Sequence, residues 1–334
     1  MSHIRVWGDW LTSDDIKRSV VSDLITQWDR DQPHRFEKMQ YRTVPESEHS
    51  NIPAVDKKLL QNHGHHWKCF EYIIENVETR KYMLLGYWDR AWESIDVMSR
   101  QDFEENCVGF FTAQGCFNPS ANLKEHPDIK YTPLNKIPWE PNTETEINRL
   151  YQEGVSNRVI PDKLHVRMMN NGYGFRSHLV HDDRFVALTG PKTQPEQHAQ
   201  ELHRHWINMD TYSVSGVSMR LIESMGLGTV ALSPRFPQRH QHEIIPDYHY
   251  VEVPFDGDHI PFGPFGENPV ATPEDNKIFK ELTNSYIDTF EKLKQDIDKI
   301  QYISANARKY YLENCTRVKY VNNLGKLLDL NKIL

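Results

Sequence analysis

Residues Asp210 to Leu232 read DTYSVSGVSMRLIESMGLGTVAL, and this stretch decides the fold that the sequence favours. Tyr212 to Val214 has the apolar, β-branched pattern of a short strand, and a turn of small residues from Ser215 to Ser218 follows it. Apolar residues at helical spacing predict a helix from Ser218 to Met225, which the Gly-Leu-Gly sequence after it would end. Thr229 to Leu232 is then expected to be a buried strand. The stretch therefore predicts a strand–turn–helix–strand unit of a parallel α/β sheet.

The start of the expected helix has the chemistry of an anion site. Free backbone N–H groups and the helix dipole favour a negative charge there. Gly216 lets the backbone approach a ligand, and the Ser218 hydroxyl can donate to a phosphate oxygen. Arg220 adds a planar, permanent cation, and Glu223, one turn on, could accept hydrogen bonds from two hydroxyls of a ribose. The same pattern also suits an ordinary helix with a serine cap and a surface Arg–Glu pair.

The pattern resembles the donor-binding segment of glycosyltransferases with the GT-B fold. It is most similar to the group that holds protein O-glucosyltransferases and capsule- or lipopolysaccharide-modifying transferases. Upstream, the resemblance includes a segment that Arg167, Gly174 and Arg176 could supply. It covers residues 163–233 of the 334, and the N-terminal half holds no motif that we can match. The residues that carry the resemblance in the stretch itself are Tyr212, Gly216, Ser218, Arg220, Glu223 and Gly228.

The resemblance implies an α/β protein with two Rossmann-like domains of the GT-B type and a cleft between them. It implies an enzyme, a hexosyl- or pentosyltransferase, that takes a sugar from a nucleotide-diphosphate sugar, with a UDP-sugar as the expected donor. Backbone amides before the helix, with Ser218 and Arg220, would stabilise the departing diphosphate. Arg167, Arg176 and Arg235 would assist, and neither a metal ion nor another cofactor would be required.

The acceptor of the sugar stays open between a glycan and a hydroxymethylated base in phage-type DNA, because viral base-glucosylating enzymes also use this fold. A DNA acceptor predicts an affinity that falls steeply with salt, and the net charge of −8 argues mildly against it. A non-catalytic protein that binds nucleotides or sugars is one alternative. Another is a metal-dependent transferase of the GT-A fold, in which Asp256 and Asp258 would hold a divalent ion.

Composition sets the broad class of the protein. The chain has 334 residues, of which 38% are hydrophobic and 26% charged, which suits two globular domains of ordinary size. No apolar run approaches the ~20 residues that cross a bilayer, and the first residues lack the apolar core of a signal peptide. The four cysteines form no CxxC pair, so free thiols in the cytoplasm are expected. The sequence leaves the oligomeric state open.

The expected domains are residues 1–155, on the acceptor side, and residues 156–334, which bind the donor and end in helices. The boundary is placed in the polar, Pro-punctuated segment from Val155 to Lys163. In the first domain, strands are expected at residues 3–7, 36–44, 81–88 and 107–112, and helices at 11–28 and 56–77. The first domain is also expected to contain a helix at 144–154. In the second, strands are expected at 163–169, 185–188 and 248–253, and helices at 197–206, 276–300, 303–312 and 318–328.

Two aspartates of the first domain are the candidates for a general base. Asp9 and Asp89 each follow an expected strand, and ligands of open α/β sheets bind at the carboxyl ends of strands. A transferase that inverts the anomeric centre needs a base to take the proton of the acceptor hydroxyl. An aspartate just after a strand is also a common turn residue, so the choice between the two, and between inversion and retention, stays open.

Overall fold

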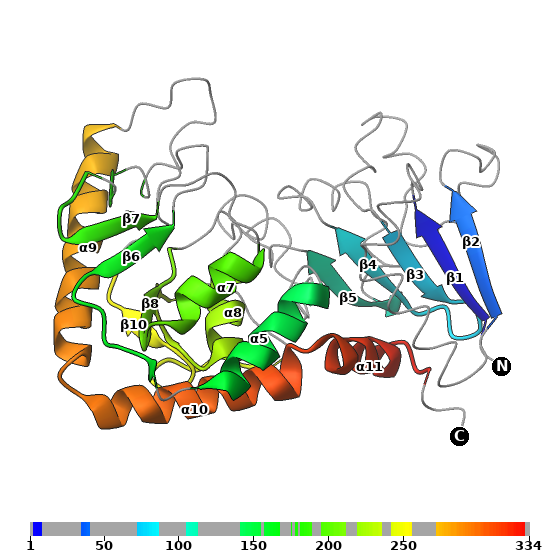
Figure 1. The fold of residues 1–334 in the computed structure, drawn as a ribbon. Helices are drawn as coiled ribbons and strands as arrows, with labels where there is room; N and C mark the ends of the chain where they lie inside the picture. The colour runs from blue at the N-terminus through cyan, green and yellow to red at the C-terminus, as the bar shows by residue number, and fades with distance from the viewer. Residues whose placement is uncertain are drawn as a thin grey trace. The chain divides into compact units, whose positions relative to one another are not determined.

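The fold is mixed α/β, and its helices and strands form two compact units (Figure 1). The first unit comprises Met1–Ile137, Pro237–Glu243 and Thr316–Leu334, and the second comprises Pro138–Phe236 and Ile244–Cys315. The expected α/β class is confirmed, whereas the boundary near residue 155 stays a prediction. A computed structural model describes residues 3–8, 35–40, 72–86, 105–112, 141–154, 157–167, 175, 178–179, 181–188, 195–211, 219–235, 242–255 and 272–330.

The first unit contains a five-stranded sheet in the order β2-β1-β3-β4-β5. β1 and β2 are parallel, β4 and β5 are parallel, and β3 is antiparallel to both of its neighbours. The strands are β1 (His3–Gly8), β2 (Arg35–Gln40), β3 (Tyr72–Asn76), β4 (Tyr82–Gly86) and β5 (Cys107–Thr112).

β3 corrects one sequence prediction, because residues 72–76 were expected to end a helix of residues 56–77. Ile73, Ile74, Glu75 and Asn76 are all buried, so β3 has no solvent-facing side to produce an alternating pattern. A short run of consecutive buried residues cannot be told from part of a helix by its periodicity. These residues form a strand because they pair with β1 on one side and β4 on the other.

The C-terminal segment, Thr316–Leu334, belongs to the first unit and contacts its sheet at the turn between β3 and β4. Helix α11 (Arg317–Leu327) is followed by residues that contact the turn between β3 and β4. The side-chain amide of Asn76 donates to the carbonyl of Leu328 at 2.8 Å, and Lys81 forms an ion pair with Asp329 at 2.6 Å. Residues near the C-terminal end of the chain therefore form part of the first unit.

The second unit contains parallel strands in two groups, β6-β7 and β8-β9-β10. β6 lies beside β8, and a parallel bridge between Val159 and His205 joins the segments that lead into them. The five strands thus follow one another in the order β7, β6, β8, β9, β10. They are β6 (Leu164–Arg167), β7 (Phe185–Leu188), β8 (Ile207–Met209), β9 (Val230–Pro234) and β10 (Val251–Val253).

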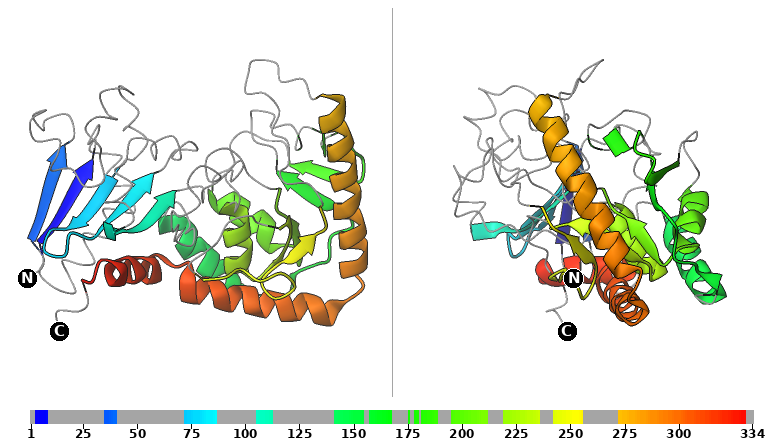
Figure 2. Two further views of the ribbon diagram at one scale, coloured as in Figure 1. Left: turned by 180° about the vertical axis from the view of Figure 1, so that it is seen from behind. Right: turned by 90° about the vertical axis from the view of Figure 1, so that its left-hand side faces the viewer.

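Two hydrophobic cores lie on opposite faces of these strands, because neighbouring residues of a strand point to opposite sides. Val230 and Leu232 of β9 belong to the core shared with α9, whereas Ala231 between them belongs to the core shared with α5, α7, α8 and α10. Figure 2 shows α9 running along one side of the strands. The helices are α5 (Pro141–Glu153), α7 (Pro195–His203), α8 (Met219–Leu227), α9 (Pro273–Leu293) and α10 (Ile297–Asn314).

α9 and α10 correct the expectation of one helix over residues 276–300. α9 ends at Leu293, and the Asp296 side chain accepts a hydrogen bond from the backbone N–H of Lys299 at 2.9 Å, which caps a new helix. Charged residues at helical spacing continue through this break, so periodicity alone missed it. Among the described residues, no helix is long and apolar enough to cross a membrane.

Candidate functional site

The parallel strands of the second unit end at one edge, which is where ligands of open α/β sheets bind. β6 ends at Arg167, β8 ends just before Asp210, and β9 ends just before Arg235. Of the expected donor-binding residues, the structure describes the backbone of Arg167 and the side chains of Arg220, Glu223 and Arg235. Outside the described residues lie Gly174, Arg176, Gly216 and Ser218, the candidate bases Asp9 and Asp89, and Asp256 and Asp258.

Helix α8 carries two of the expected donor-binding residues, Arg220 and Glu223. Arg220 is the second residue of the helix and is only 9% exposed, while Glu223, three residues on, is half-buried. The predicted helix is thereby confirmed, together with its Arg–Glu spacing. Arg235, which follows β9, is exposed. A nearly buried arginine in a first helical turn is a fixed positive charge beside the helix N-terminus, where an anion is stabilised.

Asp210 lies at this edge, and the sequence predicts no role for it. It is 1% exposed, and the hydroxyl of the equally buried Ser233 donates to its Oδ2 at 3.3 Å. Its backbone N–H donates to Leu232, and its backbone carbonyl accepts from the hydroxyl of Tyr286 at 2.6 Å. Strand β8 is only three residues long and leaves no pattern in the sequence, so its end just before Asp210 could not be predicted.

The other end of α8 is held by two buried arginines, for which the sequence predicts no role. Arg308 of α10 donates to the carbonyl of Gly226 and, at 2.8 Å, to the side chain of Asn148. Arg158 donates to the carbonyls of Leu227 and Gly228. Burial lowers the pKa of Arg158 to about 10, which still leaves it charged at neutral pH, and burial also lowers the pKa of Arg308. They complement the negative end of the helix dipole and fix where α8 lies.

Close packing adds to this anchoring of α8. Gly228 follows the helix with φ +68°, a conformation that favours glycine and ends helices, as the sequence predicted. A Cβ on Gly226 would lie 2.8 Å from the side chain of Ile147 and 2.9 Å from the ring of Tyr311. The position of Arg220 is thus set by contacts along the whole length of α8.

His249 links the turn before β10 to α10 and is 7% exposed. Its Nδ1 accepts a hydrogen bond from the backbone N–H of Ile245 at 2.9 Å, and its ring lies 4.7 Å from that of Tyr248 and 4.5 Å from that of Tyr310. Burial lowers the pKa of His249 to about 4. The side chain is therefore neutral in the folded protein throughout the range in which a free histidine titrates.

We expect His249 to make the protein sensitive to acid. The pKa of His249 is about 6.5 in the unfolded chain and about 4 in the folded protein. Below pH 6.5 the unfolded chain therefore binds more protons than the folded protein, and the free energy of unfolding decreases as the pH is lowered. The loss between pH 7 and pH 5 should be about 2 kcal/mol. His249→Asn keeps an acceptor near Nδ1 but cannot titrate, so urea denaturation should show a shallower pH dependence for this variant. Equal slopes for both proteins would contradict this role.

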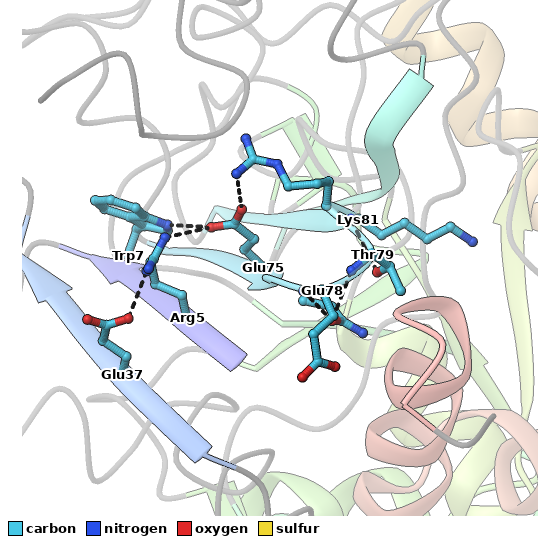
Figure 3. Close-up of polar contacts among 9 residues, drawn as sticks. Arg5, Trp7, Glu37, Glu75, Glu78, Thr79 and Lys81 are labelled. Carbon is cyan, nitrogen blue, oxygen red and sulfur yellow. Dashed lines mark hydrogen bonds and ion pairs between the residues drawn. The ribbon is translucent and has the colours of Figure 1, made fainter. Parts of the chain in front are cut away.

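The first unit holds a row of polar side chains across its sheet (Figure 3). Arg5 of β1 is opposite Glu37 on β2 and Glu75 on β3, and Glu75 is opposite Tyr82 on β4. Residues that are paired in this way point to the same face. Arg5 Nε donates to Glu37 at 3.0 Å, and this hydrogen bond is the main cause of a lowered pKa of Glu37.

Glu75, at the centre of this row, is a fully buried carboxylate. Its Oε2 accepts from the indole N–H of Trp7 at 3.3 Å and lies 3.6 Å from Arg5, and Figure 3 shows both side chains on the same side of it. Arg80 reaches its Oε1 at 3.3 Å from the turn between β3 and β4, where it has φ +61°. A buried charge needs such partners, and here they also fix the register of β1 and β3.

Replacing Glu75 by alanine should lower the free energy of unfolding of the first unit by about 2 kcal/mol. This loss of stability is smaller than that expected for breaking a fully buried ion pair, because Arg5 and Arg80 are partly exposed and can turn toward water. Glu78, which is exposed and accepts from the backbone of His3 at 3.3 Å, provides the control. Urea denaturation followed by tryptophan fluorescence should separate the two alanine variants, and equal midpoints would show that the Glu75 contacts do not stabilise the sheet.

The topology of this sheet bears on the two candidate bases. β1 and β4 run in the same direction, since each is antiparallel to β3 between them. Gly8 at the end of β1 is opposite Tyr72, and Leu85 near the end of β4 is opposite the same residue. The strands that precede Asp9 and Asp89 therefore end level with each other at one edge of the sheet.

The comparisons with known proteins add no relative to these observations. No model of a known protein family matches the chain, and no curated protein matches it significantly.

Proposed function

We propose that this protein is a glycosyltransferase that moves a sugar from a nucleotide-diphosphate sugar, with a UDP-sugar as the expected donor, to a hydroxyl. The observation that carries the proposal is the position of Arg220, which is nearly buried in the first turn of a helix that leads from β8 to β9. Glu223, one turn further, is suited to the hydroxyls of the donor's ribose. A guanidinium in the first turn of a helix, beside the positive end of the helix dipole, suits a diphosphate.

The strand order of the second unit supports a Rossmann-like domain. Pairing is parallel within each of the two groups, and the contact of β6 with β8 gives the order β7, β6, β8, β9, β10, which corresponds to the doubly wound order 2-1-3-4-5. In that order the direction of winding reverses between the first and third strands, here β6 and β8, and ligands bind at this point. We infer that the donor binds there, near the ends of the strands at Arg167 and Asp210. The first unit would be a variant in which β3 is reversed.

The proposed reaction transfers a glycosyl group between two oxygens. The acceptor hydroxyl attacks the anomeric carbon, the bond from that carbon to the diphosphate oxygen breaks, and the diphosphate leaves with the bonding electrons. Arg220, with help from Arg167, Arg176 and Arg235, would stabilise the negative charge that develops on the leaving group. In an inverting reaction Asp9 or Asp89 would take the hydroxyl proton. No metal ion is required where arginines and a helix N-terminus supply the positive charge.

Two classes of acceptor remain in the proposal, a glycan and a hydroxymethylated base in DNA. They differ in the effect of salt, because binding to DNA releases counterions and weakens steeply as the salt concentration rises. A binding assay with a hydroxymethylated DNA duplex at two salt concentrations would separate them. If the protein does not bind the DNA, or if its affinity for the DNA changes little with salt, a glycan would remain as the acceptor.

A thermal-shift screen against UDP, GDP, ADP, CMP and their common sugar conjugates, with and without EDTA, tests the proposal. At a ligand concentration of about 100 Kd, binding to the folded state adds about 2.7 kcal/mol to stability, which should raise the melting temperature by roughly 5–10 °C. A shift with one nucleoside diphosphate that survives EDTA, and transfer or hydrolysis of its sugar, would support the proposal.

The same screen separates the alternatives. A shift that requires a divalent ion would favour a metal-dependent transferase that uses Asp256 and Asp258. Binding of a nucleotide sugar without transfer or hydrolysis with any acceptor would favour a binding protein. No shift with any nucleotide would overturn the proposal, and Arg220 and Glu223 would then be ordinary residues of a helix start.

A further inference from the structure

The strands of the second unit are joined less firmly between β6 and β8 than between their other neighbours. Ladders of hydrogen bonds join β6 to β7, β8 to β9 and β9 to β10, whereas β6 lies beside β8 without a ladder in the described part of the chain. A bridge joins the segments that lead into these two strands. In it the N–H of Val159 donates to the carbonyl of Arg204 at 3.1 Å, and the N–H of Trp206 donates to the carbonyl of Val159 at 3.0 Å. We call residues 157–167 and 204–209, which form this contact, the β6–β8 junction.

Two histidine rings meet across the β6–β8 junction. His165 lies within β6 and His205 lies two residues before β8, and their ring centroids are 4.4 Å apart with planes at 68°. Leu164 and Val166 belong to the core shared with α9, so His165 between them points to the opposite face of the strands. Both histidines are half-buried. Edge-to-face packing of this kind is favourable for two neutral rings.

The surroundings of the pair favour neutral rings at pH 7. Burial is the main cause of a lowered pKa of His165 and of His205, and a charge on His205 lowers the pKa of His165 further. Among the described residues, the charged groups that act on the pair are Glu201 of α7 and Arg204. Glu201 favours a proton on either ring, Arg204 opposes one on His205, and the two groups pair with each other at 2.7 Å. A second proton on the pair therefore places two like charges side by side with little to neutralise them.

We propose that His165 and His205 form an acid-sensitive switch that opens the β6–β8 junction. Two protonated rings at this distance repel each other, and half-burial withholds part of the water that would solvate them. Acid therefore shifts the population toward an open junction in which both rings are hydrated. The donor is inferred to bind at the ends of these two strands, so the closed junction is the state that would bind it. This consequence rests on the proposed function, whereas the switch does not.

Amide exchange of the free protein at pH 7 and at pH 5.5 tests the switch. The amides of Val159 and Trp206 close the junction, and their exchange, once the intrinsic effect of pH is divided out, gives the equilibrium constant for opening. A histidine with a pKa of about 6.5 in the open state makes opening up to about eightfold more frequent at pH 5.5 than at pH 7. Two histidines multiply this factor.

The double variant His165→Phe/His205→Asn removes both charges and keeps an aromatic ring at one position and a hydrogen-bond donor at the other. Opening measured at Val159 and Trp206 should then lose its dependence on pH. The same pH dependence in the double variant as in the unmodified protein would overturn the switch.

His203→Gln is the matched control. His203 is also half-buried, and burial is the main cause of its lowered pKa, but its charged neighbours are Arg158 and residues of α5. This variant should keep the pH dependence of the β6–β8 junction. Loss of that dependence in His203→Gln as well would mean that any buried histidine nearby has the same effect, and it would overturn the assignment to the pair.

His205→Asn alone keeps the test decisive if the double variant does not fold. It removes the positive charge that opposes protonation of His165, so the pKa of His165, followed by NMR of labelled histidine, should be higher in this variant. An unchanged pKa of His165 would mean that the two rings do not act as a pair and would overturn the switch.

Amide exchange with UDP as the probe distinguishes failure of the switch from failure of the proposed function. A ligand that binds only the closed junction, at a concentration of about 100 Kd, should make opening at Val159 and Trp206 about a hundredfold rarer. Bound UDP without this effect would overturn the link between the junction and the donor site. A protein that binds no nucleotide, but loses its pH dependence in the double variant, would keep the switch and overturn the function.

Discussion

Replacing Arg220 by alanine should lower the rate of sugar transfer by about a hundredfold or more, which is the usual effect of removing one fixed donor from a developing charge. Arg220 is 9% exposed, so its charge acts in surroundings of lower dielectric constant than water, where the attraction to the departing diphosphate is stronger. The charge on that diphosphate grows toward the transition state, so kcat should fall more than KM rises. Steady-state kinetics with the nucleotide sugar identified by the thermal shift provides the measurement.

The control for this experiment must separate lost chemistry from lost stability. A nearly buried arginine also contributes to folding, so the rates should be compared at a temperature at which thermal denaturation shows both proteins to be folded. Arg220→Lys keeps the charge but loses the planar fork, and it should recover only part of the rate. Arg149→Ala removes an exposed arginine that pairs with Glu146 and Glu153 on α5, and its rate should not change. Full activity in Arg220→Ala would rule out the proposed role.

Several elements could be predicted from the sequence because local signals agree with tertiary packing. β5 and β7 have the predicted bounds, and both are short apolar runs between polar segments. The helix with Arg220 and Glu223 follows from its apolar spacing and from the glycines after it. The Arg–Glu part of the candidate site could therefore be predicted, because three-residue spacing on a helix is a local property.

Other elements could not be predicted, because partners distant in the sequence decide them. β3 is a strand because β1 and β4 pair with it, and β8 is too short to leave a pattern. Arg158 and Arg308 look like surface residues in the sequence, yet each is 7% exposed and binds carbonyls at the end of α8. The contacts of Tyr286 with Phe175 and Asp210 join three separate segments, and no local rule indicates them.

Replacing Arg308 by alanine should lower the free energy of unfolding of the second unit by about 3 kcal/mol and its melting temperature by roughly 6–12 °C. Two charge-assisted hydrogen bonds are lost, one to the carbonyl of Gly226 and one to Asn148, and the guanidinium also leaves the face of the Tyr151 ring, which it covers at 4.2 Å. The carbonyl of Gly226 then stays buried without its charged donor, which adds the cost of desolvation. Calorimetry would measure the change.

Arg149→Ala is again the matched control, because it removes an arginine whose ion pairs lie on the surface of α5. Exposed pairs contribute little, so its melting temperature should change far less. Arg308 also fixes the end of the helix that carries Arg220 at its beginning, so a shifted α8 would move that guanidinium. Arg308→Lys, which can reach one carbonyl but not Asn148 as well, should fall between the two in stability and weaken nucleotide binding in proportion. A loss of stability in Arg308→Ala no larger than in Arg149→Ala would mean that packing alone holds α8.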